Sequence, residues 1–139
     1  MAEAQKLDLI IVTPQGQKHA GLVDEIVAPG FLGEFGVLPQ HIEMFVMSRP
    51  GVFTARVGDR RERWSVGKGF IEVGPDRVQL VVQSAERAEE IDVERATRAK
   101  TRAEKALSEL DGTIDDPAYQ EQTLRLARAD ARLQAAQGK

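Results

Sequence analysis

Short runs in which apolar and polar residues alternate, or in which β-branched residues dominate, fill the chain up to residue 91. Gly and Pro separate these runs, in pairs such as Pro29-Gly30 and Pro50-Gly51. Such punctuation is typical of turns between short strands. We expect strands over residues 7–13, 21–28, 42–47, 51–57, 63–66, 70–73 and 77–83. Many short strands without long intervening helices favour an antiparallel β-sandwich over a parallel α/β sheet.

A helical period replaces the strand pattern after Ile91. Asp92 offers a capping carboxylate, Asp111-Gly112 predicts the end of a first helix, and Asp116-Pro117 predicts the start of a second. A stripe of mostly small residues follows steps of three and four: Ala96, Ala99, Ala103, Ala106, Leu107, Leu110, Leu124, Ala127, Ala131 and Ala135. Such helices pack closely but bury little apolar area. We therefore expect a marginally stable hairpin that can open and re-dock.

Composition changes at the same boundary. Twelve of the thirteen valines and ten of the twelve glycines precede Ile91, whereas ten alanines lie in residues 92–139. Two kinds of structure are therefore joined there. The expected fold class is α+β, with an N-terminal antiparallel β-sandwich followed by a C-terminal antiparallel two-helix hairpin.

Charge and residue content narrow the function classes. The net charge of −3 gives no basic excess for neutralising phosphates, so we expect no nucleic-acid partner. The chain has no cysteine, which excludes disulfides and thiolate chemistry. Residues 1–6 lack the apolar core of a signal peptide, and no uncharged apolar run is long enough to span a membrane. We expect a globular chain on the synthesising side of a membrane, or a mature form.

Charged side chains gather at the open end of the expected hairpin. If the hairpin turns near residues 113–114, Arg95 and Arg132 lie at the same height, and Arg128 shares a helix face with Arg132. Asp92 and Glu86 add carboxylates at that end. This group could bind an anionic ligand that carries a purine. Charge patterning on its own favours the alternative, a solvated and salt-bridged helix face.

The segment from Gly33 to His41, with sequence GEFGVLPQH, combines loop-forming residues with bulky apolar ones. Its apolar side chains could form a contact patch. Alternatively, Phe35, Val37 and Leu38 fold back onto the sandwich and His41 caps a strand. Both interpretations stay open at this point.

Residues for catalysis or metal binding are sparse. His19 and His41 are the only histidines, and no serine stands in a nucleophile-elbow context. Gly67-Lys-Gly69 lacks the features of a phosphate-binding loop. No pair of His or Cys ligands has suitable spacing for a metal. We therefore expect no catalytic residue, no metal and no enzyme activity.

Four motifs in this order closely resemble the epsilon subunit of F-type ATP synthases: the Gly33–His41 segment, the strand GFIEV at Gly69–Val73, the junction IDVERA at Ile91–Ala96, and the change from strands to a hairpin. The resemblance runs nearly end to end. It implies a sandwich of about ten strands in residues 1–88 and a regulatory hairpin in residues 89–139.

The resemblance also implies a place on the central rotor stalk. The sandwich of that family binds the gamma subunit and touches the polar loops of the c-ring, for which Glu34, Phe35 and His41 are the contact candidates here. The hairpin either folds against the sandwich or extends along gamma to the alpha and beta subunits, where it blocks ATP hydrolysis. The expected location is the cytoplasmic face of a bacterial cell membrane, peripheral, with membrane contact only through the complex.

A regulatory nucleotide is a further expectation from the resemblance, with no cofactor required. Some members bind ATP in the folded-down form through an Ile/Leu-Asp-x-x-Arg-Ala motif, a pair of arginines in the second helix and an upstream acid. The matching residues are Ile91, Asp92, Arg95, Ala96, Arg128, Arg132 and Glu86.

Two departures from the family pattern concern the loops. Gln40 and Lys68 stand where the family usually has glycine, and both positions could favour a positive φ. Two rival functions use the same residues differently. One is a free-standing nucleotide-sensing module, and the other is a carbohydrate- or ligand-binding sandwich whose helical arm drives oligomerisation.

Overall fold

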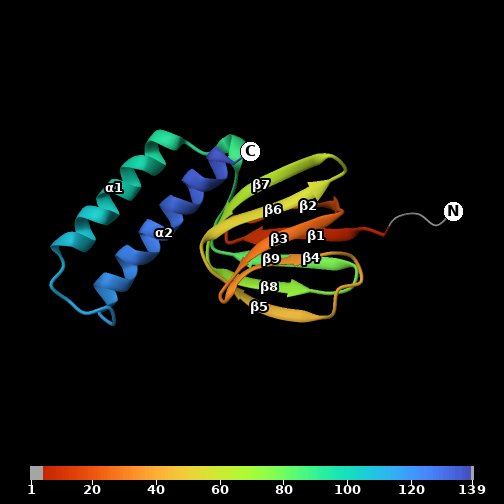
Figure 1. The fold of residues 1–139 in the computed structure, drawn as a ribbon, viewed down its shortest axis with the longest axis horizontal. Helices are drawn as coiled ribbons and strands as arrows, with labels where there is room; N and C mark the ends of the chain where they lie inside the picture. Colours follow the sequence, from red (N-terminus) through yellow and green to blue (C-terminus); the bar gives the residue numbers. More distant parts are fainter. Residues whose placement is uncertain (1–4, 139) are drawn as a thin grey trace.

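The computed structural model describes residues 5–138, which form a β-sandwich followed by a helical hairpin docked at one end of it (Figure 1). The strands are β1 (Leu7–Thr13), β2 (Gly16–Val23), β3 (Glu25–Gly30), β4 (Gly33–Val37), β5 (Met44–Ser48), β6 (Gly51–Val57), β7 (Arg60–Val66), β8 (Gly69–Val73), β9 (Arg77–Val82) and β10 (Ala85–Arg87). A short 3₁₀ turn, η1 (Ala88–Glu90), leads into α1 (Val93–Glu109) and α2 (Pro117–Gln137). The expected fold class is confirmed.

The ten strands form one continuous sheet that curls into the two layers of the sandwich (Figure 1). Their order is β10-β7-β6-β3-β5-β8-β9-β1-β2, and β4 pairs with β3 off this path. Every ladder is antiparallel except one, because β1 runs parallel to β9, with Asp8 opposite Arg77. The predicted antiparallel sandwich thus contains one parallel pair, which the sequence pattern did not predict, since the alternation of β1 fixes its faces and not its direction.

Two further predictions about strands need correction. The expected strand over 21–28 is divided between β2 and β3, which meet at Asp24. The first half of the Gly33–His41 segment, expected as a loop, is strand β4, paired with β3 from Ile26↔Val37 to Gly30↔Gly33. Two glycines obscured the strand pattern in β4. The ladder with β3 supplies its hydrogen bonds regardless of its weak β propensity.

The core lies between the two layers and follows the alternation of the strands. In β1 the side chains of Leu7, Leu9 and Ile11 point inward and are fully buried. Trp64 from β7 and Phe53 from β6 are the largest side chains of this core and pair directly across their ladder. Cross-strand aromatic pairs of this kind are the main stabilising unit of a sheet.

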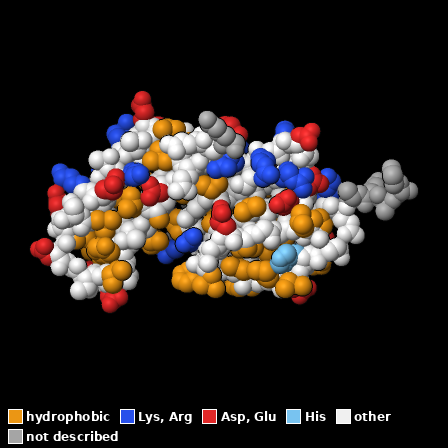
Figure 2. Space-filling model, viewed as in Figure 1, with side chains coloured by type: hydrophobic (Ala, Val, Ile, Leu, Met, Phe, Trp, Pro, Cys, Tyr) orange, Lys and Arg blue, Asp and Glu red, His pale blue; other side chains and the backbone are white. Residues whose placement is uncertain are grey.

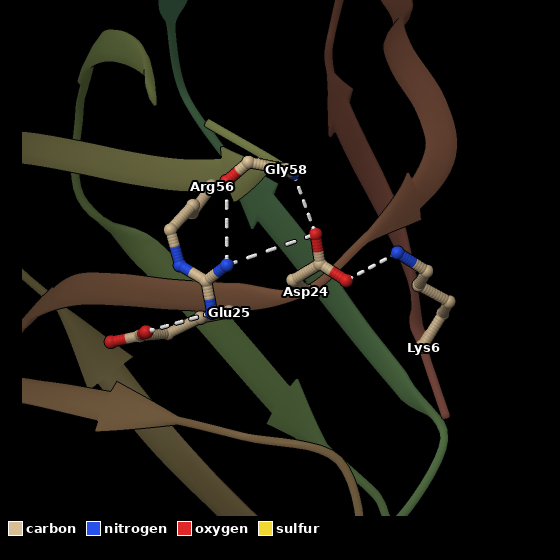
Figure 3. Close-up of polar contacts among 5 residues, drawn as sticks. All are labelled: Lys6, Asp24, Glu25, Arg56 and Gly58. Atoms are coloured by element: carbon tan, nitrogen blue, oxygen red, sulfur yellow. Dashed lines mark hydrogen bonds and ion pairs between the residues drawn. The ribbon is translucent and has the colours of Figure 1, made fainter. Parts of the chain in front are cut away.

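A polar cluster fastens the end of the sandwich that lies away from the helices (Figure 3). Asp24 accepts a hydrogen bond from the Gly58 backbone N–H over 2.7 Å and pairs with Lys6, while Arg56 pairs with Glu25 at 3.4 Å. The pKa of the Asp24 carboxyl lies below its ordinary value, chiefly because of the hydrogen bond from the Gly58 N–H and next because of the hydrogen bond from Lys6. Asp24 thereby links the start of β1 to the turn between β6 and β7.

The helix boundaries follow the predicted capping residues. The Asp92 carboxylate accepts the Arg95 backbone N–H at 3.1 Å, and the Asp116 carboxylate accepts that of Ala118 at 3.0 Å. These are N-caps of α1 and α2, and Pro117 begins α2 as expected. Small residues are buried in both helices: Ala96 and Ala103 in α1, and Ala131 and Ala135 in α2. Ala129 is also buried, although the predicted stripe omits it.

Helix α2 lies between α1 and the sandwich and packs on strands β6 and β7 (Figure 1). Its attachment includes two polar contacts: Arg63 donates to the Gln134 carbonyl at 3.4 Å, and Arg132 contacts Glu86. Lys100 and Asp130 join the two helices at 3.1 Å, and this hydrogen bond raises the pKa of Lys100. The hairpin is therefore held to the sandwich by the packing of α2 on β6 and β7 and by two polar contacts beside it.

The two departures from the family glycines differ in outcome. Gln40 has a φ of +70°, as predicted for a position that favours glycine. Its backbone N–H donates to the Pro75 carbonyl at 2.6 Å, which fixes the turn. Lys68 does not have a positive φ, so that prediction is wrong.

Candidate functional site

The junction between the two parts carries most of the predicted ligand residues. Strand β10 pairs with β7 along Ala85↔Val66, Glu86↔Ser65 and Arg87↔Trp64. The chain then passes through η1 to Ile91, which is 8% exposed and anchors the start of the hairpin. Asp92 follows at once as the cap of α1. The junction is therefore fixed to the sandwich on one side and to the first helix on the other.

A polar cleft of about 420 Å³ opens beside this junction. Five of the residues predicted from the sequence line it together: Glu86, Asp92, Arg95, Ala96 and Arg132. Its polar wall is completed by Gln15, Lys18, Ser84 and Glu90, so that strand β2, strand β10 and both helices contribute. Ile91 lies buried between two lining residues, Glu90 and Asp92, rather than on the cleft surface.

A second cleft of about 520 Å³ lies between the two helices. Its floor is formed by Ala99, Ala103 and Ala106, and its rim carries five arginines: Arg95, Arg102, Arg125, Arg128 and Arg132. Arg128, predicted to share a ligand with Arg132, lines this cleft and not the first. Arg95 and Arg132 line both clefts and therefore form their common wall.

Two arginines of the second cleft were missed by the sequence analysis. Arg102 follows Arg95 by seven residues, which is about two helical turns and places both on one face of α1. That spacing could have identified Arg102 from the sequence. Arg125 lies on the rim as well, and its guanidinium pairs with Glu121 one turn earlier at 2.7 Å. The concentration of cations over a floor of small residues suits an extended anion.

The side chains at the common wall are already engaged with one another. Arg132 donates through Nε to Oε1 of Glu86 over 2.8 Å, with each side chain about one third exposed (31% and 38%). Asp92 uses one carboxylate oxygen as the helix cap. A ligand entering the clefts would thus meet Arg132 already paired with Glu86. It would have to share this ion pair or displace it.

The expected partner-contact residues lie elsewhere on the sandwich and do not form one group. Glu34 and Phe35 line a shallow apolar groove of about 530 Å³ with Phe31, Leu32, Phe45 and Met47. Phe35 also packs against the core, whereas Leu38 is exposed. His41 lies outside this groove, and its Nδ1 is 2.8 Å from the Ile42 carbonyl.

Apolar side chains extend beyond this groove. Figure 2 shows a band of hydrophobic side chains along the edge of the sandwich where Figure 1 places β5. The exposed members include Phe45 (62%) and Phe70 on neighbouring strands, whose rings stack at 5.4 Å. The band continues into an apolar cleft of about 630 Å³ that Leu124 of α2 shares with Val12, Phe31, Met47 and Val81. Contiguous exposed apolar surface of this kind is typical of interaction sites.

The described part of the chain has neither a cluster of metal-binding side chains nor a helix that could span a membrane. Within residues 5–138, three or more His, Cys, Asp or Glu side chains nowhere converge as a metal ion would require. In the same range, neither helix is long and apolar enough to cross a membrane.

Two family models together match almost the whole chain. Residues 6–88 match the beta-sandwich domain of the ATP synthase Delta/Epsilon chain. Residues 89–137 match the long alpha-helix domain of the same chain.

Individual relatives and solved structures are similar over comparable lengths. "ATP synthase epsilon chain 2" of Syntrophotalea carbinolica is 44% identical over 133 residues, covering 96% of this chain and 95% of that one. "ATP synthase epsilon chain" of Geobacter metallireducens is 43% identical over 136 residues, with 98% and 96% covered. A chain in the Euglena gracilis mitochondrial ATP synthase structure has the same fold, with a TM-score of 0.81, 22% identity, and 99% of this chain and 84% of that chain covered.

Proposed function

The chain belongs to the Delta/Epsilon chain family of ATP synthases, as an epsilon chain and a non-catalytic subunit, and from that premise we propose that it couples rotation to the catalytic head and restrains ATP hydrolysis. In this role the sandwich binds the gamma subunit and the polar loops of the c-ring on the central stalk. The hairpin is the regulatory part. The chain is peripheral, on the cytoplasmic face of a bacterial membrane, and meets the membrane only through the complex.

The observation that carries the proposal is the docked hairpin, with an open apolar surface beside it. The apolar band of the sandwich and the cleft under Leu124 are uncovered in the single chain, and they supply a surface on which a partner can bury Phe45, Phe70 and Met47. We assign this surface to gamma. Glu34, Phe35 and His41 stay the candidates for contact with the c-ring.

The hairpin suits a two-state element. Its contact with the sandwich runs through α2 and a few polar pairs, and the buried side chains of both helices are all alanines. Small apolar contacts of this kind allow two arrangements of similar free energy. We propose that the arrangement in Figure 1 is the non-inhibitory one. In the other, the helices extend along gamma toward the alpha and beta subunits and block hydrolysis.

ATP is the proposed ligand of the two clefts. The first offers carboxylates and the small Ala96 side chain for a purine and ribose, and the second offers arginines for the phosphates. Arg95 and Arg132, which line both, would contact the nucleotide where these parts join. A ligand at one hundred times its dissociation constant favours the form that binds it by about 2.7 kcal/mol. ATP would therefore hold the hairpin down.

Co-purification with gamma tests the main proposal. The chain should form a stable complex with the gamma subunit of the same species, and failure to do so would remove the rotor function. ATP binding without gamma binding would instead support the free-standing nucleotide sensor. Binding of neither would leave the ligand-binding sandwich as the remaining function.

A further inference from the structure

The strand path of the sandwich has two free ends, and side chains bridge them. The path begins at β10 and ends at β2, with no ladder between these strands among the described residues. Arg87 of β10 donates through Nη2 to Nδ1 of His19 on β2 at 3.2 Å. The His19 ring also meets the Trp64 indole edge to face, with centroids 5.7 Å apart. Side-chain contacts thus connect the two edges that the backbone ladders leave apart.

Arg87 is the centre of this bridge. Its guanidinium carbon lies 4.5 Å from the centroid of the Trp64 ring, and its Nη1 is 3.7 Å from a carboxylate oxygen of Glu62. A cation over an indole ring is attracted by the negative face of that ring. Three side chains from two other strands therefore hold one guanidinium. The next residues along the chain are η1 and the start of the hairpin.

The hydrogen bond to His19 requires a neutral imidazole. A guanidinium has donors and no acceptor, so Nδ1 must accept and the ring proton must lie on Nε2. Nε2 is buried with no hydrogen-bond partner. No neighbouring acceptor therefore stabilises the positive charge that the ring would carry with both nitrogens protonated. Protonation of Nδ1 would replace the hydrogen bond by two opposed N–H groups on two cations.

The groups around His19 favour this neutral form. Burial lowers the pKa of His19 most, Glu62 of β7 raises it, and Arg87 of β10 lowers it again. Glu62 is itself shared with Arg87 and with Arg60 at 4.0 Å. On the ladder with β1, His19 lies opposite the apolar Ile11. The net direction is downward, so His19 is neutral at neutral pH.

We propose that His19 and Arg87 form a pH-sensitive latch across the open seam of the sandwich, whose release in acid loosens β10 and undocks the hairpin that follows it. Arg87 acts as a positioning residue, because it fixes the strand that presents Glu86 to the nucleotide cleft. Since the depressed pKa belongs to the docked form, the stabilisation is complete above the ordinary histidine pKa of about 6.5. It is lost as the pH falls from there through the lowered pKa of His19.

The latch is tested on the whole chain, without nucleotide or partner, so that the result is independent of ATP and gamma binding. Because the chain has no cysteine, Glu43→Cys and Thr113→Cys place two dyes at unique exposed positions, one on the sandwich and one at the hairpin turn. Energy transfer between the dyes should fall when the pH is lowered from 8 to 5. His19→Gln, which has an amide oxygen and no titrating group at this position, should abolish this step, that is, the fall in energy transfer between pH 8 and pH 5.

His41→Gln is the matched control, because it removes the other histidine of the chain and should leave the step intact. Nuclear magnetic resonance of the His19 ring in the otherwise unaltered chain supplies a readout independent of any variant's folding. The ring should titrate below the ordinary value, with the proton on Nε2 above the transition, and Arg87→Gln should shift the midpoint. An unchanged dye separation across this pH range, or a step that persists in His19→Gln, overturns the latch.

Discussion

Arg132 of helix α2 and Glu86 of strand β10 are joined by a hydrogen bond of 2.8 Å between Nε and Oε1, and this bond ties the second helix directly to the sandwich. Both residues also line the first cleft. The same pair therefore fastens the hairpin and forms one wall of the proposed nucleotide site.

The pair should stabilise docking measurably but modestly. We expect a coupling free energy of about 0.5–1 kcal/mol in a double-mutant cycle of Glu86→Ala, Arg132→Ala and the double variant, because both side chains are partly exposed and solvent screens their charges. Hydrogen exchange of the α2 backbone amides gives the free energy of opening. Strict additivity of the two single variants would mean that the pair contributes nothing to docking.

Asp92 and Asp116 form a matched pair for the nucleotide prediction. Each caps a helix, so Ala at either position should cost about 1 kcal/mol of helix stability. Only Asp92 lines the cleft. Isothermal titration should therefore show ATP affinity reduced by roughly tenfold in Asp92→Ala, the cost of one hydrogen bond to a charged group. Asp116→Ala should bind ATP like the unaltered chain. No heat with any variant at millimolar ATP would refute nucleotide binding itself.

Removal of the hairpin tests its inhibitory role. A chain truncated before Asp92 keeps the whole sandwich and its apolar band, so the complex should assemble normally. Its rate of ATP hydrolysis should rise, because the helices that reach the catalytic subunits are gone. The measurement compares purified complexes at equal subunit content. Equal hydrolysis rates in the truncated and full-length complexes would contradict inhibition.

Two phenylalanines of the sandwich, Phe53 on β6 and Phe45 on β5, separate core packing from partner binding. Phe53 is fully buried, and Phe53→Ala should lower the free energy of unfolding by roughly 3–5 kcal/mol through loss of apolar burial and a residual cavity. Phe45 is 62% exposed, so Phe45→Ala should cost about 0.5 kcal/mol or less. Urea denaturation gives both values. Phe45→Ala should nonetheless weaken retention by gamma, and undiminished retention would place the gamma surface elsewhere.

Asp24 makes the sandwich sensitive to acid. Its folded-state pKa is depressed, so its stabilisation is present above the ordinary carboxyl pKa of about 3.9 and is lost as the pH falls through the lower folded-state pKa. Asp24→Asn should lower the urea midpoint at pH 7 and flatten its decline in acid. Asp59→Asn removes a neighbouring exposed carboxylate and serves as the control. Identical acid profiles for the two variants would exclude the Asp24 cluster as the cause.

Local chemistry made the helices predictable from the sequence. The caps Asp92 and Asp116 and the following Pro117 act within one turn of the backbone, and the structure places all three as expected. Strand β4 and the parallel pairing of β1 depend on partners far along the chain, so the sequence pattern could not specify them. The break between β2 and β3 at Asp24 could not be predicted for the same reason, because the groups that hold Asp24 come from Lys6 and Gly58.

The candidate site, too, was predictable from the sequence only where local geometry decides it. The grouping of Arg95 with Arg132 followed from helix geometry alone, and both residues line the same two clefts. The separation of Arg128 into the second cleft depends on how α2 lies against the sandwich, which the sequence does not encode locally. The bridge between Arg87 and His19 was invisible for that reason, since its residues come from opposite ends of the strand path.

The parallel ladder of β1 with β9 bears on the order in which the protein can fold during synthesis. The first strand must wait for a partner whose pairing begins with Arg77 opposite Asp8, so the sandwich cannot close until that region has left the ribosome. Contacts between distant residues slow folding, whereas the helices of the hairpin form from near neighbours. The nascent chain thus holds β1 with an unfilled edge until late in translation. Completion of the sandwich, rather than formation of the helices, should set the folding rate.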